Sequence, residues 1–377
     1  MKRQGEKRTI IKENNASYEC FIPTKLADLH DLNINEEINK SIVKANIELA
    51  KLEEASLNIP DINTFLAGYV YKEALLTSKI EGTQCTMEDI FDENNPANIN
   101  LEVEDVIRYH KALNVAIHDS NRLPLCNRML CRIHEELLNG IDSKYPGSFR
   151  RTQNWIGGKD IKSAKFVPPN PEEINNLMLD LEKFINHNEK YDLLVVISLV
   201  HYQFETIHPF LDGNGRIGRM IALLMMLEKK ALTYPILYLS YFLKKNKLDY
   251  SEYLTKVRRT GDYESWLLFF INAIAESSKE SYLSIKQIDN LVKKHKHILE
   301  VKKCKKITFK VFDILLEKPI INIKTIKDRL GVTFKTASLQ VKKMLEYKIL
   351  SKTSQVQKNQ TFVYKEYLDI LSKNTEI

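Results

Sequence analysis

The chain has 377 residues, with 56 Lys and Arg against 49 Asp and Glu, and 44% of its residues are hydrophobic. This length allows two or three domains with a sizeable core. A membrane-spanning helix needs about 18 consecutive apolar residues, and no such run occurs, so we expect no membrane partner. The N-terminus lacks the apolar core of a secretory signal, and the five cysteines form no CxxC pair, so we expect a cytoplasmic protein without a zinc site.

The basic excess is confined to the C-terminal quarter of the chain. Residues 281–377 hold 21 basic and 9 acidic side chains, whereas residues 1–280 hold 35 and 40. This shift in composition predicts a separate C-terminal module, of a kind that nucleic acid would attract.

Good helix formers at helical spacing predict a mainly α-helical protein. Between residues 146 and 171, glycines and prolines interrupt this pattern, and residues 154–168 alternate as a short β-hairpin would. A Lys-rich stretch at 286–306 is predicted to be a linker or an exposed helix. In chain order, helices are expected at 35–57, 61–82, 102–118, 124–138, 172–186, 191–206, 215–229 and 249–275.

The basic C-terminal segment has the pattern of a winged helix-turn-helix. It combines three helices with two short strands and a polar loop. If it binds DNA, its third helix would enter the major groove; the rival interpretation is dimerisation with a second copy or target capture. The helices are expected at 307–317, 323–330 and 333–347, the strands at 349–352 and 361–364, and the polar face of the third helix at Lys335, Thr336, Ser338, Gln340 and Lys343.

The densest chemical motif joins two apolar helices between His208 and Arg219. The tripeptide at residues 213–215 is Gly-Asn-Gly, which can turn sharply and direct backbone N–H groups at one spot. A helix begins directly after it, so the helix dipole would favour an anion there. Arg216 and Arg219 are three residues apart and would share one side of the first turns, where their guanidinium groups suit phosphate oxygens. The motif therefore predicts a phosphate site.

Two further side chains of this loop suit chemistry on a nucleotide. Asp212 offers the hard oxygen ligand that Mg²⁺ prefers beside phosphates. His208 carries the side chain whose unperturbed pKa, about 6.5, suits a general base near neutral pH. The loop therefore predicts a site for a magnesium nucleotide with a base nearby.

The string from His208 to Arg219 resembles the signature of the Fic (Fic/Doc) family, HxFx[D/E]GNGRxxR, and matches it at every defined position. The resemblance implies a Fic-type helical bundle with a small β-hairpin flap. It also implies transfer of AMP from ATP to a Ser, Thr or Tyr hydroxyl of an unidentified target protein, with release of pyrophosphate. Doc-type kinases of the family have a lysine where this chain has Gly213, which favours AMP transfer over phosphate transfer.

The resemblance assigns a role to each residue of the string. His208 would deprotonate the target hydroxyl, and Phe210 would anchor the loop in the core. The implied ligand roles are Mg²⁺ binding by Asp212, binding of the α- and β-phosphates by Gly213, Asn214, Gly215 and Arg216, and binding of the γ-phosphate by Arg219.

The end of the helix predicted at 61–82 resembles the family's inhibitory motif, [S/T]xxxE[G/N]. Thr77 and Glu81 are four residues apart, and Gly82 suits a helix terminus. By this resemblance Glu81 would pair with Arg219 and leave ATP misaligned. The same glutamate would instead orient a water molecule if the reaction were the removal of AMP, and the sequence leaves both roles open.

The resemblance also extends to the flap and to the adenine side of the site. Ile161, Lys162, Ser163 and Ala164 would be the most exposed part of a flap that positions the target protein, although an ordinary surface hairpin would look the same. Tyr241 and Asn246 would meet adenine or ribose, although a helix that is part core and part surface explains them equally well.

These patterns divide the chain and leave three functions open. We expect an N-terminal helical region at 1–110, a Fic catalytic core at 111–285, the linker or helix at 286–306 and the winged helix at 307–377. The first function is an autoinhibited protein adenylyltransferase that uses ATP and Mg²⁺. The alternatives are an enzyme that removes AMP, and a DNA-binding regulator whose Fic region senses a nucleotide.

Overall fold

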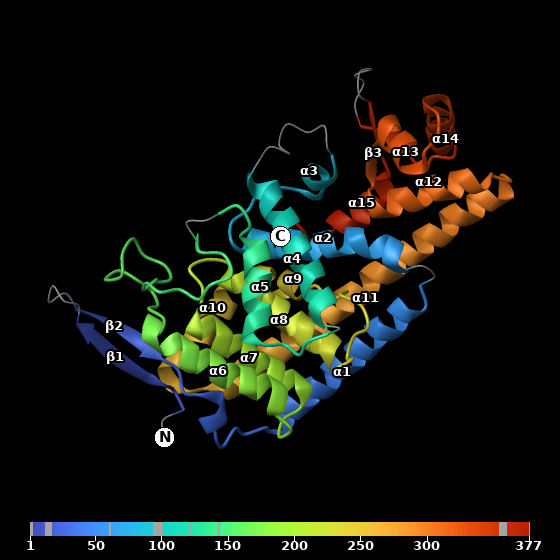
Figure 1. Ribbon diagram of the computed structural model, residues 1–377. Helices are drawn as coiled ribbons and strands as arrows, with labels where there is room; N and C mark the ends of the chain where they lie inside the picture. The colour runs from blue at the N-terminus through green and yellow to red at the C-terminus, as the bar shows by residue number, and fades with distance from the viewer. Residues whose placement is uncertain are drawn as a thin grey trace. The chain divides into compact units, whose positions relative to one another are not determined.

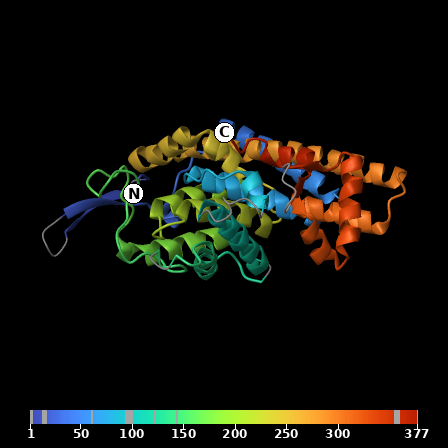
Figure 2. The same ribbon diagram turned by 90° about the horizontal axis from the view of Figure 1, so that it is seen from above.

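The computed structural model describes residues 3–376 apart from 12–16, 60–61, 93–100, 121, 142–143 and 354–359 (Figures 1 and 2). It is mainly helical, as predicted. The strands are β1 (Glu6–Ile11), β2 (Ser17–Ile22), β3 (Ile320–Asn322), β4 (Ser351–Lys352) and β5 (Thr361–Val363). The helices are η1 (Leu26–Asp28), α1 (Glu36–Leu57), α2 (Ile62–Ile80), α3 (Met87–Phe91), α4 (Leu101–Ser120), α5 (Asn127–Leu137), α6 (Pro171–His187), α7 (Leu193–Ile207), α8 (Asn214–Glu228), α9 (Leu239–Lys245), α10 (Lys247–Thr260), α11 (Tyr263–Val301), α12 (Lys306–Glu317), α13 (Ile323–Leu330), α14 (Phe334–Glu346) and α15 (Lys365–Ser372).

The chain forms two compact units that interleave along the sequence. The first comprises Met1–Ile47, Lys111–Leu232 and Lys245–Glu276, and the second comprises Glu48–His110, Thr233–Lys244 and Ser277–Ile377. The domain boundaries expected from the sequence remain a prediction. Among the described residues, no helix combines the length and the apolar character that crossing a membrane requires.

Most predicted helices are present within a few residues of their expected bounds. One differs. The stretch 249–275 is not one helix, because Gly261 adopts a positive φ of 71° and ends α10 before α11 begins. The Lys-rich stretch after 286, for which a linker or a helix was predicted, is helical as far as Val301. The expected start of the second helix, Asp61, lies outside the described residues.

The core of the first unit is the pair α7 and α8. Every side chain of α7 from Leu194 to Ile207 is buried, and so are most of those of α8. Gly218 of α8 faces the carboxylate of Glu205 on α7 so closely that a Cβ atom would collide with it. Glycine at this position therefore leaves room for the buried Glu205 carboxylate between the two helices that carry the ends of the motif.

An N-terminal β-hairpin, which the sequence analysis missed, extends the flap. Strands β1 and β2 pair antiparallel, with Glu6 opposite Ile22. The Phe21 N–H donates to the Val167 carbonyl at 3.0 Å, which joins β2 to the flap. The flap itself is the predicted hairpin, closed by an antiparallel bridge between Ile156 and Phe166. Figure 1 shows the hairpin projecting beside α10 and the flap loop.

The C-terminal part of the second unit has the element order helix, strand, two helices, two strands and helix. Its sheet has the order β3-β5-β4, with Ile320 opposite Val363 and Ser351 opposite Val363 on the other side. The predicted helices and the last two strands are present, and β3 and α15 are additional. One prediction was wrong: Gln340 is 4% exposed and accepts a hydrogen bond from Thr308 at 2.8 Å, so it belongs to the core.

Helix α2 packs within this unit against α12 and α15. The contact is close at Gly68, where a Cβ atom would lie 2.9 Å from the Tyr367 hydroxyl and 3.3 Å from Leu371 Cδ1. Tyr367 is itself fully buried and donates to the Leu316 carbonyl at 3.0 Å, so it cannot turn away without losing that bond. Glycine therefore fits α2 to the C-terminal helices.

We predict that Gly68→Ala destabilises the protein by about 1–3 kcal/mol, although alanine is the better helix former, because the added methyl group overpacks this contact. Removing the hydroxyl should relieve part of the strain. In a double-mutant cycle measured by urea unfolding, Gly68→Ala should therefore cost less in a Tyr367→Phe background than in the wild type. Equal costs in both backgrounds would contradict the assigned contact.

Candidate active site

The motif forms a loop between the end of α7 and the start of α8. His208 ends α7 in the left-handed conformation, with φ 51° and ψ 59°, and its N–H donates to the Phe204 carbonyl at 2.9 Å. For a residue with a Cβ atom this conformation costs about 1–2 kcal/mol, so the surroundings must hold it. Helix α8 begins at Asn214, with Gly213 before it at φ 75°.

Arg150 holds the strained end of this loop. Its Nε donates to the His208 carbonyl at 2.9 Å, and its backbone N–H donates to the Pro209 carbonyl at 2.8 Å. The other guanidinium nitrogens donate to the Pro169 carbonyl at 2.6 Å and to Gln153 Oε1 at 3.0 Å. Burial lowers the pKa of Arg150 to about 10, so it remains a cation at neutral pH. The sequence analysis did not single out Arg150.

Asn214 closes the loop from inside. Its Oδ1 accepts from the Phe210 N–H at 2.9 Å, and its Nδ2 donates to the Phe210 carbonyl at 2.8 Å. Asn154 adds a second donor to the same carbonyl at 3.1 Å. Asn214 is 2% exposed and Phe210 is fully buried, so the amide satisfies backbone groups that would otherwise be costly to bury. The Asn214 side chain thus shapes the loop, and Phe210 is buried as expected.

His134 of α5 supports the loop by packing against Phe210. The two rings stack at a centroid distance of 3.9 Å. Its Nδ1 accepts from the Gly147 N–H at 2.9 Å. The proton must therefore lie on Nε2, which is 3.2 Å from the Asp212 carbonyl and donates to it. Burial lowers the pKa of His134 to about 4, which keeps this neutral tautomer at neutral pH. No signal in the sequence pointed to His134.

His201 supports α8 in the same way. Its Nδ1 lies 3.0 Å from the Gly218 carbonyl and donates to it, and its Nε2 lies 2.9 Å from the Tyr250 hydroxyl. Burial lowers the pKa of His201 to about 3. This histidine links α7, α8 and α10 as a neutral hydrogen-bonding group.

The start of α8 has the features of an anion site. Gly213 has no side chain to cap the helix, and an α-helix leaves its first N–H groups without partners inside the helix. A Cβ atom on Gly213 would lie 3.1 Å from Leu137 Cδ2, which together with its positive φ requires glycine. Arg216 and Arg219 are 7% and 2% exposed. Two buried guanidinium groups therefore accompany this helix terminus.

Asp212 is the one acidic side chain of the motif and remains half exposed. Its Oδ1 accepts from the Gly213 N–H at 2.7 Å. Lys144 and Arg216 each lie 3.6 Å from its carboxylate. Within the described part of the chain, no three His, Cys, Asp or Glu side chains gather to form a metal site. One carboxylate beside an anion site still fits Mg²⁺, which usually takes one or two carboxylates together with substrate phosphates and water.

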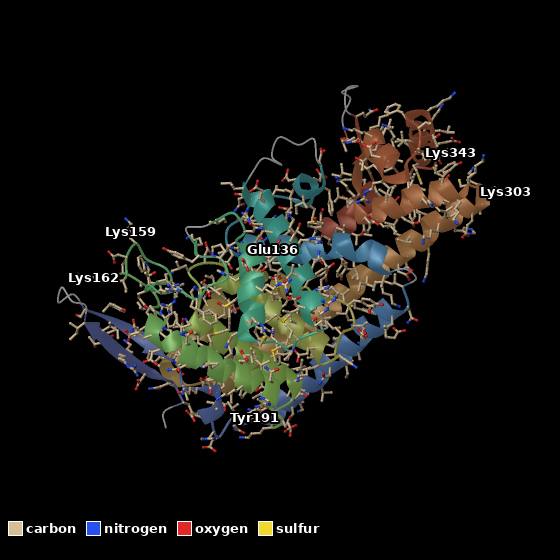
Figure 3. All side chains as sticks on the ribbon, viewed as in Figure 1. Glu136, Lys159, Lys162, Tyr191, Lys303 and Lys343 are labelled. Carbon is tan, nitrogen blue, oxygen red and sulfur yellow. The ribbon has the colours of Figure 1, made fainter. Side chains whose placement is uncertain are left out.

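The flap is closed at its tip by its own polar groups. Asp160 Oδ1 accepts from the Ser163 N–H at 2.8 Å, and Ser163 Oγ accepts from the Lys159 N–H at 3.0 Å. Lys159 and Lys162 extend from this tip (Figure 3). The predicted exposed portion was partly wrong: Lys162 and Ser163 are exposed, but Ile161 and Ala164 are half-buried because they face the groove described below.

The remaining predicted residues fall in both units. Glu81 lies in the turn after α2, where its N–H donates to the Ser78 carbonyl at 3.0 Å, and it is exposed, whereas Thr77 is fully buried. These two residues and Tyr241 belong to the second unit, while Asn246 precedes α10 in the first unit. The pairing of Glu81 with Arg219 and the adenine-side roles stay predictions.

Two segments of the chain match family descriptions. Residues 124–226 match the Fic/DOC family, and residues 39–118 match the Fic/DOC family N-terminal region. The chain is 29% identical over 164 residues to "Protein adenylyltransferase Fic" of Drosophila grimshawi and 30% identical over 156 residues to that of Culex quinquefasciatus. These alignments cover 43% and 41% of this chain but 31% and 28% of the relatives, so less than a third of each relative is matched.

Solved structures share the fold. A Fic family protein from Desulfovibrio desulfuricans G20 superposes with a TM-score of 0.57 at 17% identity, covering 88% of this chain and 97% of that one. A Fic domain containing signaling protein from Bacteroides thetaiotaomicron VPI-5482 has a TM-score of 0.52 at 16% identity and covers 66% of this chain and 97% of that one. The chain is therefore a mainly helical protein of the Fic fold that carries a Fic/DOC family segment.

We predict that acid destabilises the protein from about pH 6.5 downward. The unfolded chain binds protons at His134 and His201 near their ordinary pKa of 6.5, whereas the folded chain does so only near 4 and 3. The free energy of unfolding should thus fall as the pH drops from 6.5 towards 4, by up to about 1.4 kcal/mol per pH unit for each histidine.

Urea unfolding at pH 7.5, 6 and 5 measures this slope. His134→Gln should lower the overall stability but flatten the dependence on pH. His187→Gln, which changes an exposed histidine at the end of α6, should leave the slope unchanged. A slope that His134→Gln leaves intact would contradict the assignment.

Proposed function

We propose that the chain, which carries a Fic/DOC family segment at residues 124–226, is a protein adenylyltransferase. It transfers AMP from ATP to a Ser, Thr or Tyr hydroxyl of a target protein and releases pyrophosphate. The observation that supports this most is the loop geometry: a histidine held in a strained conformation lies six residues before the start of a helix that offers N–H donors and two buried arginines. The named relatives support the same reaction.

In this reaction His208 acts as the general base. Its Nδ1 is buried, so Nε2 is the nitrogen that a target hydroxyl would reach. Nε2 takes the hydroxyl proton as the oxygen attacks the α-phosphorus of ATP. The bond from that phosphorus to the bridging oxygen breaks, and its electron pair leaves with pyrophosphate. Arg150 contributes by holding the His208 backbone, so that the ring is positioned before the target binds.

The start of α8 binds the triphosphate. Backbone N–H groups after Gly213 and the guanidinium groups of Arg216 and Arg219 stabilise the negative charge of the phosphates and of the leaving group. Asp212 would hold Mg²⁺, which when bound neutralises charge on the phosphate oxygens. Asn214 keeps the loop closed around these groups through its two bonds to Phe210.

Glu81 is proposed to restrain this activity. It lies in the turn that ends α2, and the string from Thr77 to Gly82 resembles the inhibitory motif of the family. The rival role, orientation of water for AMP removal, makes the opposite prediction, because Glu81 would then be required for turnover.

We predict that label from α-labelled ATP with Mg²⁺ passes to protein at least about tenfold faster in Glu81→Gly than in the wild type, since a charge-assisted hydrogen bond contributes about 1.5–3 kcal/mol. Glu81→Gln separates loss of charge from a more flexible backbone. Adding His208→Ala should lower transfer by about 10²–10⁴-fold, the usual contribution of a general base.

His187→Ala serves as the control for the histidine substitution and should not change transfer. The absence of transfer in every variant, with ATP binding confirmed by calorimetry, would refute the adenylyltransferase. Loss of label from a pre-modified target that requires Glu81 would identify the AMP-removing enzyme instead.

A second function is proposed for residues 306–363, a winged helix that binds DNA. The element order α12-β3-α13-α14-β4-β5 with the sheet order β3-β5-β4 supports it. Lysines are exposed on α13 and α14, namely Lys324, Lys327, Lys335 and Lys342. Phe334 and Leu339, also exposed on α14, favour the rival role in binding a second copy or another protein.

We predict that Lys335→Glu combined with Lys342→Glu weakens binding to a 20-base-pair duplex in fluorescence anisotropy. The slope of log K against log salt should also fall by about 1 for each phosphate that the variant no longer binds. Lys183→Glu with Lys190→Glu makes the same charge change in the other unit and should have little effect. Equal binding by both double variants would remove DNA as the partner of α14.

A further inference from the structure

The first unit contains a groove of about 670 Å³ that the motif residues do not line. Most of its lining comes from three elements. Strand β2 contributes Ser17–Phe21, the flap contributes residues between Ile161 and Val167, and α10 contributes Thr255, Arg258 and Arg259. Lys7 of β1 also faces it. The N-terminal hairpin of β1 and β2 therefore supplies one side of this groove, and the flap and α10 supply the rest.

The backbone of β2 presents a strand edge to the groove. Phe21 directs its N–H away from β1, because it donates to Val167. In an antiparallel pair, alternate residues point their N–H and C=O groups to the same side. Glu19 and Ser17 therefore also direct theirs away from β1, on the side of the flap. Beyond the Phe21–Val167 bond, this edge continues for four residues to Ser17, a length of about 13 Å.

The groove is strongly basic. Five of its side chains are cations, namely Lys7, Lys162, Lys165, Arg258 and Arg259, and Glu19 is the one carboxylate among the residues that line it. Lys7 pairs with Glu19 at 3.1 Å, which leaves the positive charge of the other four. Lys162, Lys165 and Arg259 are exposed, so their charge is available to a partner.

A fixed stack of side chains supports this basic surface. The Arg258 guanidinium lies over the Phe166 ring at 3.6 Å from its centroid, and its Nε donates to Thr206 Oγ1 at 3.3 Å. The Phe166 ring in turn contacts Phe21 of β2 at 6.0 Å. The flap, β2 and α10 are thus held in one arrangement, so a partner would not have to order them.

We propose that this groove binds an extended acidic segment of the protein substrate, which adds as a strand along the edge of β2. The inference rests on the proposed function, since it assigns the substrate class of the same enzyme. Main-chain hydrogen bonds to the strand edge would supply affinity, and carboxylates at alternate positions would meet Lys162, Lys165 and Arg259. A nucleic acid would satisfy the cations but has no peptide groups for the strand edge.

The groove is connected to the catalytic loop through the end of the flap. Val167 lines the groove, and the next two carbonyls are anchored: Pro168 accepts from Gln153 Nε2 at 2.8 Å, and Pro169 accepts from Arg150 at 2.6 Å. Arg150 also holds His208. A segment bound along β2 would therefore be registered against the same arginine that positions the base.

Fluorescence anisotropy of a labelled eight-residue peptide that alternates Glu with Thr tests this proposal, with the full chain at 50 mM salt and without nucleotide. Wild-type protein should bind it. Lys165→Glu with Arg259→Glu should weaken binding at least about tenfold, because two attractions become repulsions. Lys183→Glu with Lys190→Glu is the matched control and should bind as the wild type does. A peptide with alternate amides N-methylated should bind at least about tenfold more weakly.

Three outcomes would overturn the proposal: unchanged binding by the Lys165→Glu, Arg259→Glu protein, unchanged binding of the methylated peptide, or tighter binding of a labelled oligothymidine that the same variant loses. The last would make the groove a nucleic-acid site. Because no nucleotide or hydroxyl chemistry enters this assay, it separates the two proposals. A protein that binds the peptide as expected yet never transfers AMP would refute only the enzyme.

Discussion

The site depends on one buried cation, Arg150, and on the backbone oxygens that it binds. A guanidinium 3% exposed is costly unless its donors are satisfied, and here they end on the carbonyls of His208 and Pro169 and on Gln153. Those acceptors come from the flap and from the end of α7. The same group therefore holds the strained His208 backbone and fixes the flap relative to it. If either shifted, the buried Arg150 guanidinium would lose hydrogen-bond acceptors, which is costly for a buried charge.

Around this centre, neutral histidines serve as structural hydrogen-bonding groups. His134 links α5 to the Asp212 carbonyl, and His201 links α7 to the Gly218 carbonyl in α8. In both cases burial holds the pKa near 3 to 4, so each ring keeps one donor and one acceptor at neutral pH. His208 differs from them in its proposed role as a base, which requires a proton-accepting nitrogen.

The sequence predicted the helices and the motif because these are local patterns. The string from His208 to Arg219 is contiguous, and the helices repeat apolar residues at a fixed spacing. The roles of Arg150 and His134 were not predicted, because these side chains bind residues that lie 58 and 78 positions away in the sequence. Strand β1 was not predicted, because it is exposed on both faces and shows no alternation of buried and exposed residues. Gln340 was misplaced because a polar side chain can be buried when a partner such as Thr308 lies opposite.

The close packing at Gly68 has a geometric consequence for the residues that follow it. Because Gly68 must face Tyr367 and Leu371 for α2 to approach them this closely, the C-terminal helices fix the rotation of α2 about its own axis. Each residue of an α-helix advances the phase by about 100° and the axis by about 1.5 Å. The direction in which the chain leaves α2 at Glu81 is therefore set by the count of residues from Gly68, and a single insertion between them would turn it by more than a quarter of a circle.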